Sequence, residues 1–294
     1  STPGLFTAWG GVLAYSFQLY FDFSGYSDMA IGLSRMFGVK LPLNFNSPYK
    51  ATNITEFWRR WHMTLSRFLR DYLYIPLGGN RHGPWRRQFN LAVTMLLGGL
   101  WHGAGWNFVI WGGLHGFYLV ANHGWKDLKR RLGWSGGGPL AAVSGVLLTF
   151  TCVNVAWVFF RAPDLGSALS VLGGLVGVHG AALPAAILSR LEFLHPFTQA
   201  LHIGSFLGGG GQFVGNYLWV AAAAFIAFAF PNTQELLRRY APALQDSRQS
   251  ARPDFALLAL RWKPTPGWAL FIGLLGAAGL LSLTRPSEFL YFQF

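Results

Sequence analysis

Residues 89–115, FNLAVTMLLGGLWHGAGWNFVIWGGLH, place a histidine between two apolar runs. The first run, Leu91–Leu100, leads into Trp101 and His102, and the second begins at Trp106 after a Gly-Ala-Gly break. An ionisable side chain is costly inside a membrane and by default marks a functional position there. Non-helical backbone is tolerated at that depth only where protein or a water-filled cavity surrounds it. The stretch therefore predicts that His102 lies at the centre of a buried reaction site.

The composition of the chain predicts an integral membrane protein. Of its 294 residues, 52% are hydrophobic and only 12% are charged, whereas about 25% of the residues in a soluble domain are charged. The basic residues gather in short loops between apolar runs, as the positive-inside rule expects, so the net charge of +12 does not indicate nucleic-acid binding. Cys152 is the single cysteine, which excludes a disulfide framework or a cysteine-based metal site, and we predict no metal centre.

We predict an all-α, polytopic fold with four to six membrane crossings. Single spans are expected over residues 5–23, 140–160, 217–230 and 268–283. If the basic clusters at 81–87 and 126–131 lie on one side, residues 88–125 must enter and return, with a turn near Gly103–Gly105. Shorter helices are expected over 29–37, 165–178 and 181–194, a glycine-rich loop over 202–215, a basic loop over 231–263 and a packed aromatic tail over 286–294.

Residues 54–72 mix arginines with aromatic side chains and predict one helix lying at the membrane interface, with its arginines toward lipid headgroups. Asn53 and Glu56 have the spacing of a capping box at its start. His62 is four residues from both Trp58 and Ser66, so the three would share one stripe of this helix. The two prolines in residues 40–48 predict an extended segment before it.

Histidine is the chemistry that remains after other motifs are excluded. The chain has no G-x-S-x-G elbow, no phosphate-binding P-loop and no H-E-x-x-H zinc motif. A neutral imidazole can take a proton from a hydroxyl or thiol as an acyl group arrives. His102 is the strongest candidate, and the alternative is that it only bonds a carbonyl at the Gly103 break. For His62 the alternative is a headgroup contact, and His115 is expected to form a helix–helix hydrogen bond.

Two aspartates, Asp22 and Asp28, flank Gly25 at the expected membrane edge. They could orient a histidine or pair with Arg35, or they could form only a structural ion pair or helix cap.

Residues 21–81, from FDFSGYSD to PLGGNR, and residues 96–116, LLGGLWHGAGWNFVIWGGLHG, closely resemble the membrane-bound O-acyltransferases, and within them the bacterial alginate O-acetyltransferase branch. Residues 157–162 and 231–235 match as well. The resemblance implies that His102 is the essential histidine of the family and that His62 is a second polar position facing the same tunnel. Further candidates to line that tunnel are Trp61, Ser66, Trp101, Asn107 and Asp22.

The resemblance also implies an architecture and a reaction. We expect one transmembrane domain over residues 1–294, a ring of helices around a funnel with re-entrant and interfacial helices, forming the C-terminal part of a longer member that has further N-terminal helices. It would sit in the bacterial inner membrane as a multi-pass protein in contact with membrane lipid. It would hold no bound cofactor, take acetyl groups from acetyl-CoA or another cytoplasmic acyl thioester, and serve O-acetylation of an exported polysaccharide, alginate first, through periplasmic acetyltransferase partner proteins.

Other readings stay open at this stage. Within the same class of reaction, the chain could support D-alanyl transfer toward teichoic acid, or acetylation of peptidoglycan or cellulose. From a different class, it could be a non-catalytic conduit or scaffold that moves acyl groups while a partner performs the chemistry. A His102→Ala variant separates catalysis from conduction.

Overall fold

The computed structural model describes all residues except 1, 135, 191–192, 194, 245–259 and 284–294. The chain divides into two compact units. The first comprises residues 1–24 and 44–228, and the second comprises residues 25–43 and 229–294. The predicted packing of the aromatic tail, 286–294, lies outside the described residues.

Helix α1 (Leu5–Met36) is a single helix of 32 residues. The expected break after residue 23 and the separate helix over 29–37 were therefore wrong. No proline occurs in this stretch, and one internal glycine such as Gly25 costs a helix only about 1 kcal/mol. Its first part is held within the first unit by Ser16, whose hydroxyl donates to Asn154 Oδ1 at 2.6 Å and whose carbonyl accepts from the Tyr49 hydroxyl at 2.7 Å.

The expected interfacial helix over 54–72 is broken. It forms α2 (Ile54–Trp58), α3 (Met63–Leu69) and a π-helical turn, η2 (Arg70–Tyr74), preceded by a short 3-10 turn, η1 (Pro48–Lys50). The extended segment before it causes the break, because Asn46 N–H donates to the Arg60 carbonyl and Met63 N–H donates to the Asn44 carbonyl, both at 2.9 Å. These contacts take backbone groups that a continuous helix would use internally.

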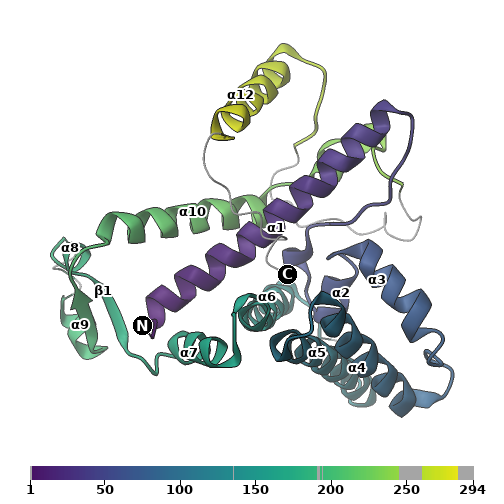
Figure 1. The fold of residues 1–294 in the computed structure, drawn as a ribbon, viewed down its shortest axis with the longest axis horizontal. Helices are drawn as coiled ribbons and strands as arrows, with labels where there is room; N and C mark the ends of the chain where they lie inside the picture. Colours follow the sequence, from purple (N-terminus) through teal and green to yellow (C-terminus); the bar gives the residue numbers. More distant parts are fainter. Residues whose placement is uncertain (1, 135, 191–192, 194, 245–259, 284–294) are drawn as a thin grey trace. The chain divides into compact units, whose positions relative to one another are not determined.

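Helices α4 (Gly83–His102) and α5 (Trp106–Arg131) form a hairpin in which they lie side by side (Figure 1). Residues 103–105 join them, which confirms the predicted turn. The helices pack through small residues: a Cβ atom at Gly99 would overlap the Phe108 carbonyl oxygen, and one at Gly112 would overlap the Met95 carbonyl oxygen. Such close approach of backbones is typical of helix pairs in membranes. The depth of this hairpin in a membrane stays a prediction.

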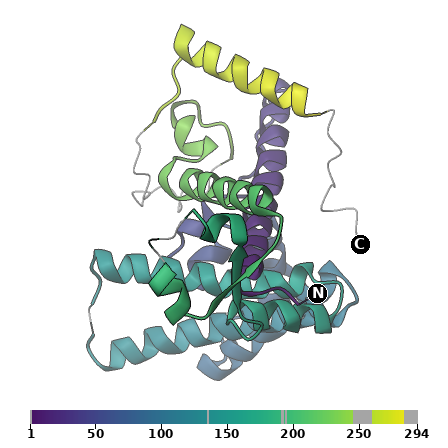
Figure 2. The ribbon, with the colours of Figure 1, turned by 90° about the vertical axis from the view of Figure 1, so that its left-hand side faces the viewer.

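Two helices in the described part of the chain are long and apolar enough to cross a membrane, α6 (Pro139–Arg161) and α10 (Gly210–Ala229). Helix α6 agrees with the predicted span over 140–160, and α10 begins earlier than the predicted 217. Figure 2 shows α6 running alongside α5, on which it packs. Two apolar helices are shorter, α7 (Leu165–Leu175) and α12 (Pro266–Ser282). The expected four to six crossings therefore stay a prediction.

The all-α prediction was wrong between residues 181 and 206. Strands β1 (Ala181–Pro184) and β2 (Ile203–Phe206) pair in parallel, with Ala181 opposite Ile203. Two short helices, α8 (Ala185–Leu188) and α9 (His195–Ala200), lie between them in sequence. The backbone at Gly180 has a φ of 78°, which ends any helix before the first strand. Apart from this small sheet the described elements are helical.

The second unit contains α11 (Thr233–Leu236), the 3-10 turn η4 (Arg238–Tyr240) and α12. Asn232 and Glu235 form a complete capping box at the start of α11. Gln234 Nε2 donates to Asp28 Oδ1 at 3.4 Å, and Leu244 N–H donates to the Leu41 carbonyl at 2.8 Å. The side chain of Asp28 thus has a partner in the second unit, Gln234, which the sequence did not predict.

Candidate active site

His102 ends α4, directly before the turn of the hairpin. Its ring makes edge-to-face contacts with Trp111 of α5 and Phe160 of α6, each with ring centroids 5.1 Å apart. The neighbouring Trp101 also contacts the imidazole, at 4.9 Å, although its own side chain is 61% exposed. His102 is therefore half-buried where three helices of the first unit meet.

His62 lies in the break between α2 and α3. Its backbone has a φ of 41° and a ψ of 56°, the left-handed region that residues other than glycine rarely adopt. Its Nδ1 atom is 3.1 Å from Asn44 Oδ1, and its ring contacts Phe23 edge-to-face at 4.8 Å and stacks on Phe45 at 6.4 Å. Backbone strain of this kind is concentrated at functional sites, so the conformation supports the selection of His62 as a candidate.

His62 and His102 interact electrostatically although 40 positions separate them in the sequence. Neither α2 nor α3 is long enough to span a membrane, so the break that carries His62 lies outside the spanning helices. Burial, followed by the nearby His102, lowers the pKa of His62 to about 4. At neutral pH its imidazole is uncharged and has a lone pair with which it can accept a proton.

Aromatic rings contact each of these two histidines. We call Trp61, Trp111, Trp157 and Phe160 the aromatic wall. Trp61 contacts Trp157 at 5.1 Å, Trp111 stacks on Trp157 at 5.9 Å, and Trp157 meets Phe160 at 5.4 Å. Three of the four rings, those of the tryptophans, are at most 4% exposed. A wall of this kind excludes water, which strengthens electrostatic interactions nearby and suppresses hydrolysis of a reactive acyl group.

His115 has a different role from the other two histidines. It is fully buried, its Nδ1 accepts a hydrogen bond from Trp58 Nε1–H at 3.3 Å, and its ring stacks on Phe57 at 6.1 Å. This bond joins α2 to α5 and confirms the expected helix–helix hydrogen bond. Trp58 was expected to share a stripe with His62, but the break in the helix directs it to His115 instead.

The other candidate residues are Trp61, Ser66 and Asn107, which make structural contacts in the first unit, and Asp22, which bonds within its own helix. Trp61 belongs to the aromatic wall, and the Ser66 hydroxyl donates to the Trp61 carbonyl at 3.3 Å. Asn107 Nδ2 donates to the Ala162 carbonyl at 2.7 Å, which ties α5 to the end of α6. Asp22 is exposed on α1, and its carboxylate bonds the side chain of Gln18 one turn earlier. Asp22 thus has a partner on its own helix and is the weakest of the candidates.

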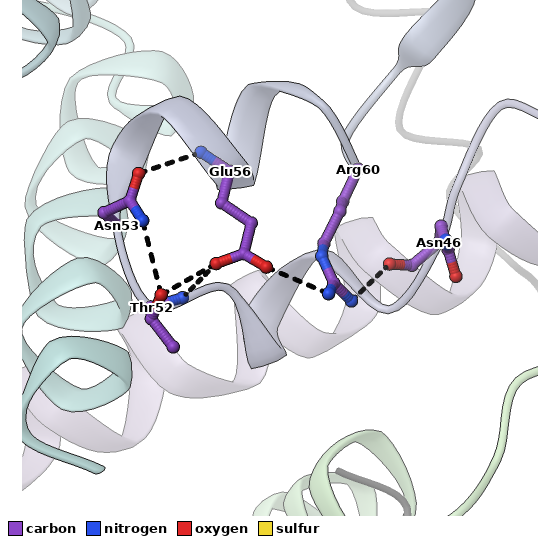
Figure 3. Close-up of polar contacts among 5 residues, drawn as sticks. All are labelled: Asn46, Thr52, Asn53, Glu56 and Arg60. Atoms are coloured by element: carbon purple, nitrogen blue, oxygen red, sulfur yellow. Dashed lines mark hydrogen bonds and ion pairs between the residues drawn. The ribbon is translucent and has the colours of Figure 1, made fainter. Parts of the chain in front are cut away.

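A polar network that sequence reasoning recognised only in part supports the His62 break (Figure 3). Asn53 Oδ1 accepts from Glu56 N–H at 3.2 Å, as a cap should. The Glu56 carboxylate accepts from the Thr52 backbone N–H and hydroxyl, at 3.0 and 2.8 Å. It also pairs with Arg60 at 3.0 Å, whose guanidinium donates to the Asn46 carbonyl at 3.3 Å.

The charge of Arg60 is therefore used inside the protein, and the expectation that this arginine faces lipid headgroups was wrong. Burial alone would raise the pKa of the Glu56 carboxyl, but the two hydrogen bonds from Thr52 and the pairing with Arg60 outweigh burial and hold this pKa below its ordinary value. Sequence spacing indicated the Asn53 cap, whereas nothing in the sequence alone indicated that Arg60 reaches the 44–47 segment.

Among the described residues, no group of three or more histidine, cysteine, aspartate or glutamate side chains is placed to hold a metal ion. The site offers the imidazoles of His62 and His102 for proton transfer.

Comparison with known proteins gives a consistent family. The sequence profile of MBOAT, the membrane-bound O-acyltransferase family, matches residues 2–155. A probable alginate O-acetylase from Pseudomonas putida is 39% identical over 289 residues, covering 98% of this chain and 53% of the relative. A peptidoglycan O-acetyltransferase from Helicobacter pylori is 54% identical over 188 residues, covering 64% of this chain and 35% of the relative.

A more distant relative is a teichoic acid D-alanyltransferase from Streptococcus thermophilus, 34% identical over 167 residues, covering 51% of this chain and 40% of the relative. The chain spans about a third to a half of the length of these curated relatives. The matched profile covers more than half of the chain and includes both histidines of the site. The chain therefore belongs to the membrane-bound O-acyltransferase family.

Proposed function

We propose that this chain carries the reaction centre of a membrane O-acyltransferase that serves O-acetylation of an exported polysaccharide. The observation that carries the proposal is the His102 imidazole at the glycine turn, which meets Trp111 and Phe160 and interacts electrostatically with His62, in a chain of this family. Relatives named for alginate O-acetylation align with nearly the whole chain, which favours alginate or a similar polymer as the final acceptor.

The proposed step is a direct transfer from an acyl thioester, such as acetyl-CoA, to a hydroxyl group. One imidazole takes the hydroxyl proton while the hydroxyl oxygen attacks the thioester carbonyl carbon. A carbon–oxygen bond forms, the carbon–sulfur bond breaks, and the leaving thiolate takes up the proton as a free thiol. His102 is the base in this scheme, and His62 orients the second reactant as a hydrogen-bond acceptor.

Water must be kept from this site because hydrolysis of the thioester is the competing reaction. The rings of Trp111 and Phe160 contact His102 and give it an environment of low polarity. In the proposed arrangement the thioester arrives from the cytoplasm and the acyl group leaves toward periplasmic partner proteins. The whole protein would then be a multi-pass protein of the bacterial inner membrane, with the chain described here forming a single transmembrane domain.

Acetylation of peptidoglycan is a second candidate function, which the 54% identity to the Helicobacter pylori enzyme favours. The reaction at the histidines is the same, and only the acceptor differs. Analysis of both polymers from cells that carry His102→Ala separates the two functions. Loss of acetyl groups from the exported polysaccharide supports the first function, and their loss from peptidoglycan supports the second.

The test of catalysis is a chromosomal His102→Ala variant in the cells that make the protein. His123→Ala is a matched control, because His123 lies on α5 with its Nδ1 bonded to the Leu119 carbonyl at 2.7 Å, apart from the site. We expect polymer acetylation to disappear with His102→Ala and to persist with His123→Ala, at equal amounts of membrane-inserted protein. Retained acetylation in the His102→Ala cells would refute catalysis and leave the conduit or scaffold reading.

A further inference from the structure

The side chain of Asn44 makes three contacts that together define a proton position on His62. Its Oδ1 atom lies 3.1 Å from His62 Nδ1, 3.3 Å from the backbone nitrogen of Thr64 and 2.9 Å from the Thr64 hydroxyl. Backbone N–H groups only donate hydrogen bonds, so the atom that Thr64 N–H reaches must be the oxygen of Asn44 and not its amide nitrogen. A carbonyl oxygen only accepts, so His62 Nδ1 must carry the hydrogen.

The Thr64 hydroxyl agrees with this assignment. Its oxygen lies 3.4 Å from His62 Nδ1 as well as 2.9 Å from Asn44 Oδ1. A hydroxyl has one hydrogen, which it donates to Asn44 Oδ1 because that atom has none to give. Toward His62 the hydroxyl oxygen can then only accept. Both neighbours of Nδ1 are thus acceptors, and the neutral ring keeps its lone pair on Nε2.

Asn44 also holds the backbone of His62 in place. Its carbonyl accepts from Met63 N–H at 2.9 Å, immediately after the left-handed residue. The same residue therefore fixes the main chain at the break and the hydrogen on the ring. We propose that Asn44 is a positioning residue that sets the Nδ1–H form of His62, so that Nε2 is the basic atom that His62 presents to the reaction.

The surroundings of His62 leave this role to Asn44. Phe23 from α1 and Phe45 from the extended segment are apolar rings, and Thr64 from α3 is a hydroxyl. Among the described residues, the titratable side chain that interacts with His62 electrostatically is His102 from α4. The contacts that would favour one ring form over the other are therefore those of Asn44 and Thr64. The role of that form in acyl transfer rests on the proposed function, whereas the form itself does not.

The first experiment is independent of activity. Nitrogen-15 NMR of histidine-labelled protein in lipid nanodiscs, with His62→Gln used to assign the signals, reports which ring nitrogen of His62 carries hydrogen. We expect Nδ1–H at neutral pH in the wild type, and a mixture of the two forms in Asn44→Leu, which removes the acceptor at similar size. A wild-type ring protonated at Nε2 alone would overturn the proposal, even if Asn44→Leu failed to fold.

The second experiment tests the consequence for the reaction. In Asn44→Asp a carboxylate can still accept from Thr64 and from His62 Nδ1–H, but it also stabilises the charged imidazolium. We expect the acidic limb of the acyl-transfer rate against pH to move upward by about one to three pH units. Asn46→Asp makes the same change two positions along the segment and should leave the limb in place. An Asn44→Asp profile that coincides with the wild type would refute the positioning role.

The two experiments separate this inference from the proposed function. If His62→Gln transfers acyl groups at the wild-type rate, His62 has no part in the reaction and the proposed function loses one of its two histidines. The NMR result for the wild-type ring would still test the Nδ1–H form of His62 in that case.

Discussion

Replacement of Gly99 by alanine tests whether the α4–α5 hairpin depends on direct backbone contact. A Cβ atom at Gly99 would overlap the Phe108 carbonyl oxygen and lie 3.1 Å from the Gly112 Cα atom. Both neighbours are main-chain atoms of α5, so no side chain can rotate away and the helices must separate. Overpacking costs about 1–3 kcal/mol, and more where backbone must move, whereas alanine gains about 1 kcal/mol over glycine in a helix interior. We expect Gly99→Ala to lose up to roughly 2 kcal/mol net.

Gly124→Ala is the matched control, because a Cβ atom at Gly124 of α5 meets nothing within 4 Å. It should gain about 1 kcal/mol from helix propensity alone. The assay is thermal unfolding in detergent. Unfolding is monitored by the reaction of a fluorescent maleimide with Cys152, which is half-buried in α6 beside the hairpin. Gly99→Ala should unfold several degrees below the wild type and Gly124→Ala slightly above it. A Gly99→Ala protein that unfolds at or above the wild-type temperature would refute the argument from backbone contact.

Three further predictions concern the segment around α2. The pKa of the Glu56 carboxyl lies below its ordinary value of 4.5. The contribution of this carboxylate to stability is therefore complete above that pH and is lost as the pH falls through the lowered pKa. Glu56→Gln should reduce the fall in Tm between roughly pH 5 and pH 3. Trp58→Phe should cost about 1–3 kcal/mol, since it leaves the buried His115 Nδ1 without its donor, and a double-mutant cycle with His115→Phe measures the coupling. His62→Ala should lower Tm more than His62→Gly, because both remove the ring but only alanine keeps about 1 kcal/mol of left-handed strain; equal Tm values would contradict the strain.

The features that the sequence predicted well are those that local residues determine. The hairpin turn follows from Gly103 and Gly105 between two apolar runs, and both helices end there as expected. Helix α6 follows from one uninterrupted apolar run of sufficient length. The bond between His115 and Trp58 was expected in kind, because a buried polar ring must find a partner, but its donor could not be named.

The features that the sequence predicted poorly depend on residues that are distant along the chain. A helix over 54–72 satisfies every local rule, and it breaks because the backbone of residues 44 and 46 bonds to residues 63 and 60. The two strands between 181 and 206 form by pairing with each other, as Ala181 does with Ile203, and not through local sequence alone. No propensity or periodicity in one segment contains the position of its partner.

The break that made the helix prediction wrong also gives His62 and His115 different contacts. On a continuous helix His62 would lie one turn from Trp58, on the face that meets His115 of α5. The left-handed backbone at His62 ends that register, so Trp58 stays with His115 while His62 turns toward Asn44 and interacts with His102. A strained conformation persists only where its surroundings over-determine it, and here Asn44 supplies both a backbone and a side-chain contact. The geometry of the candidate site and the failure of the local prediction therefore have the same physical cause.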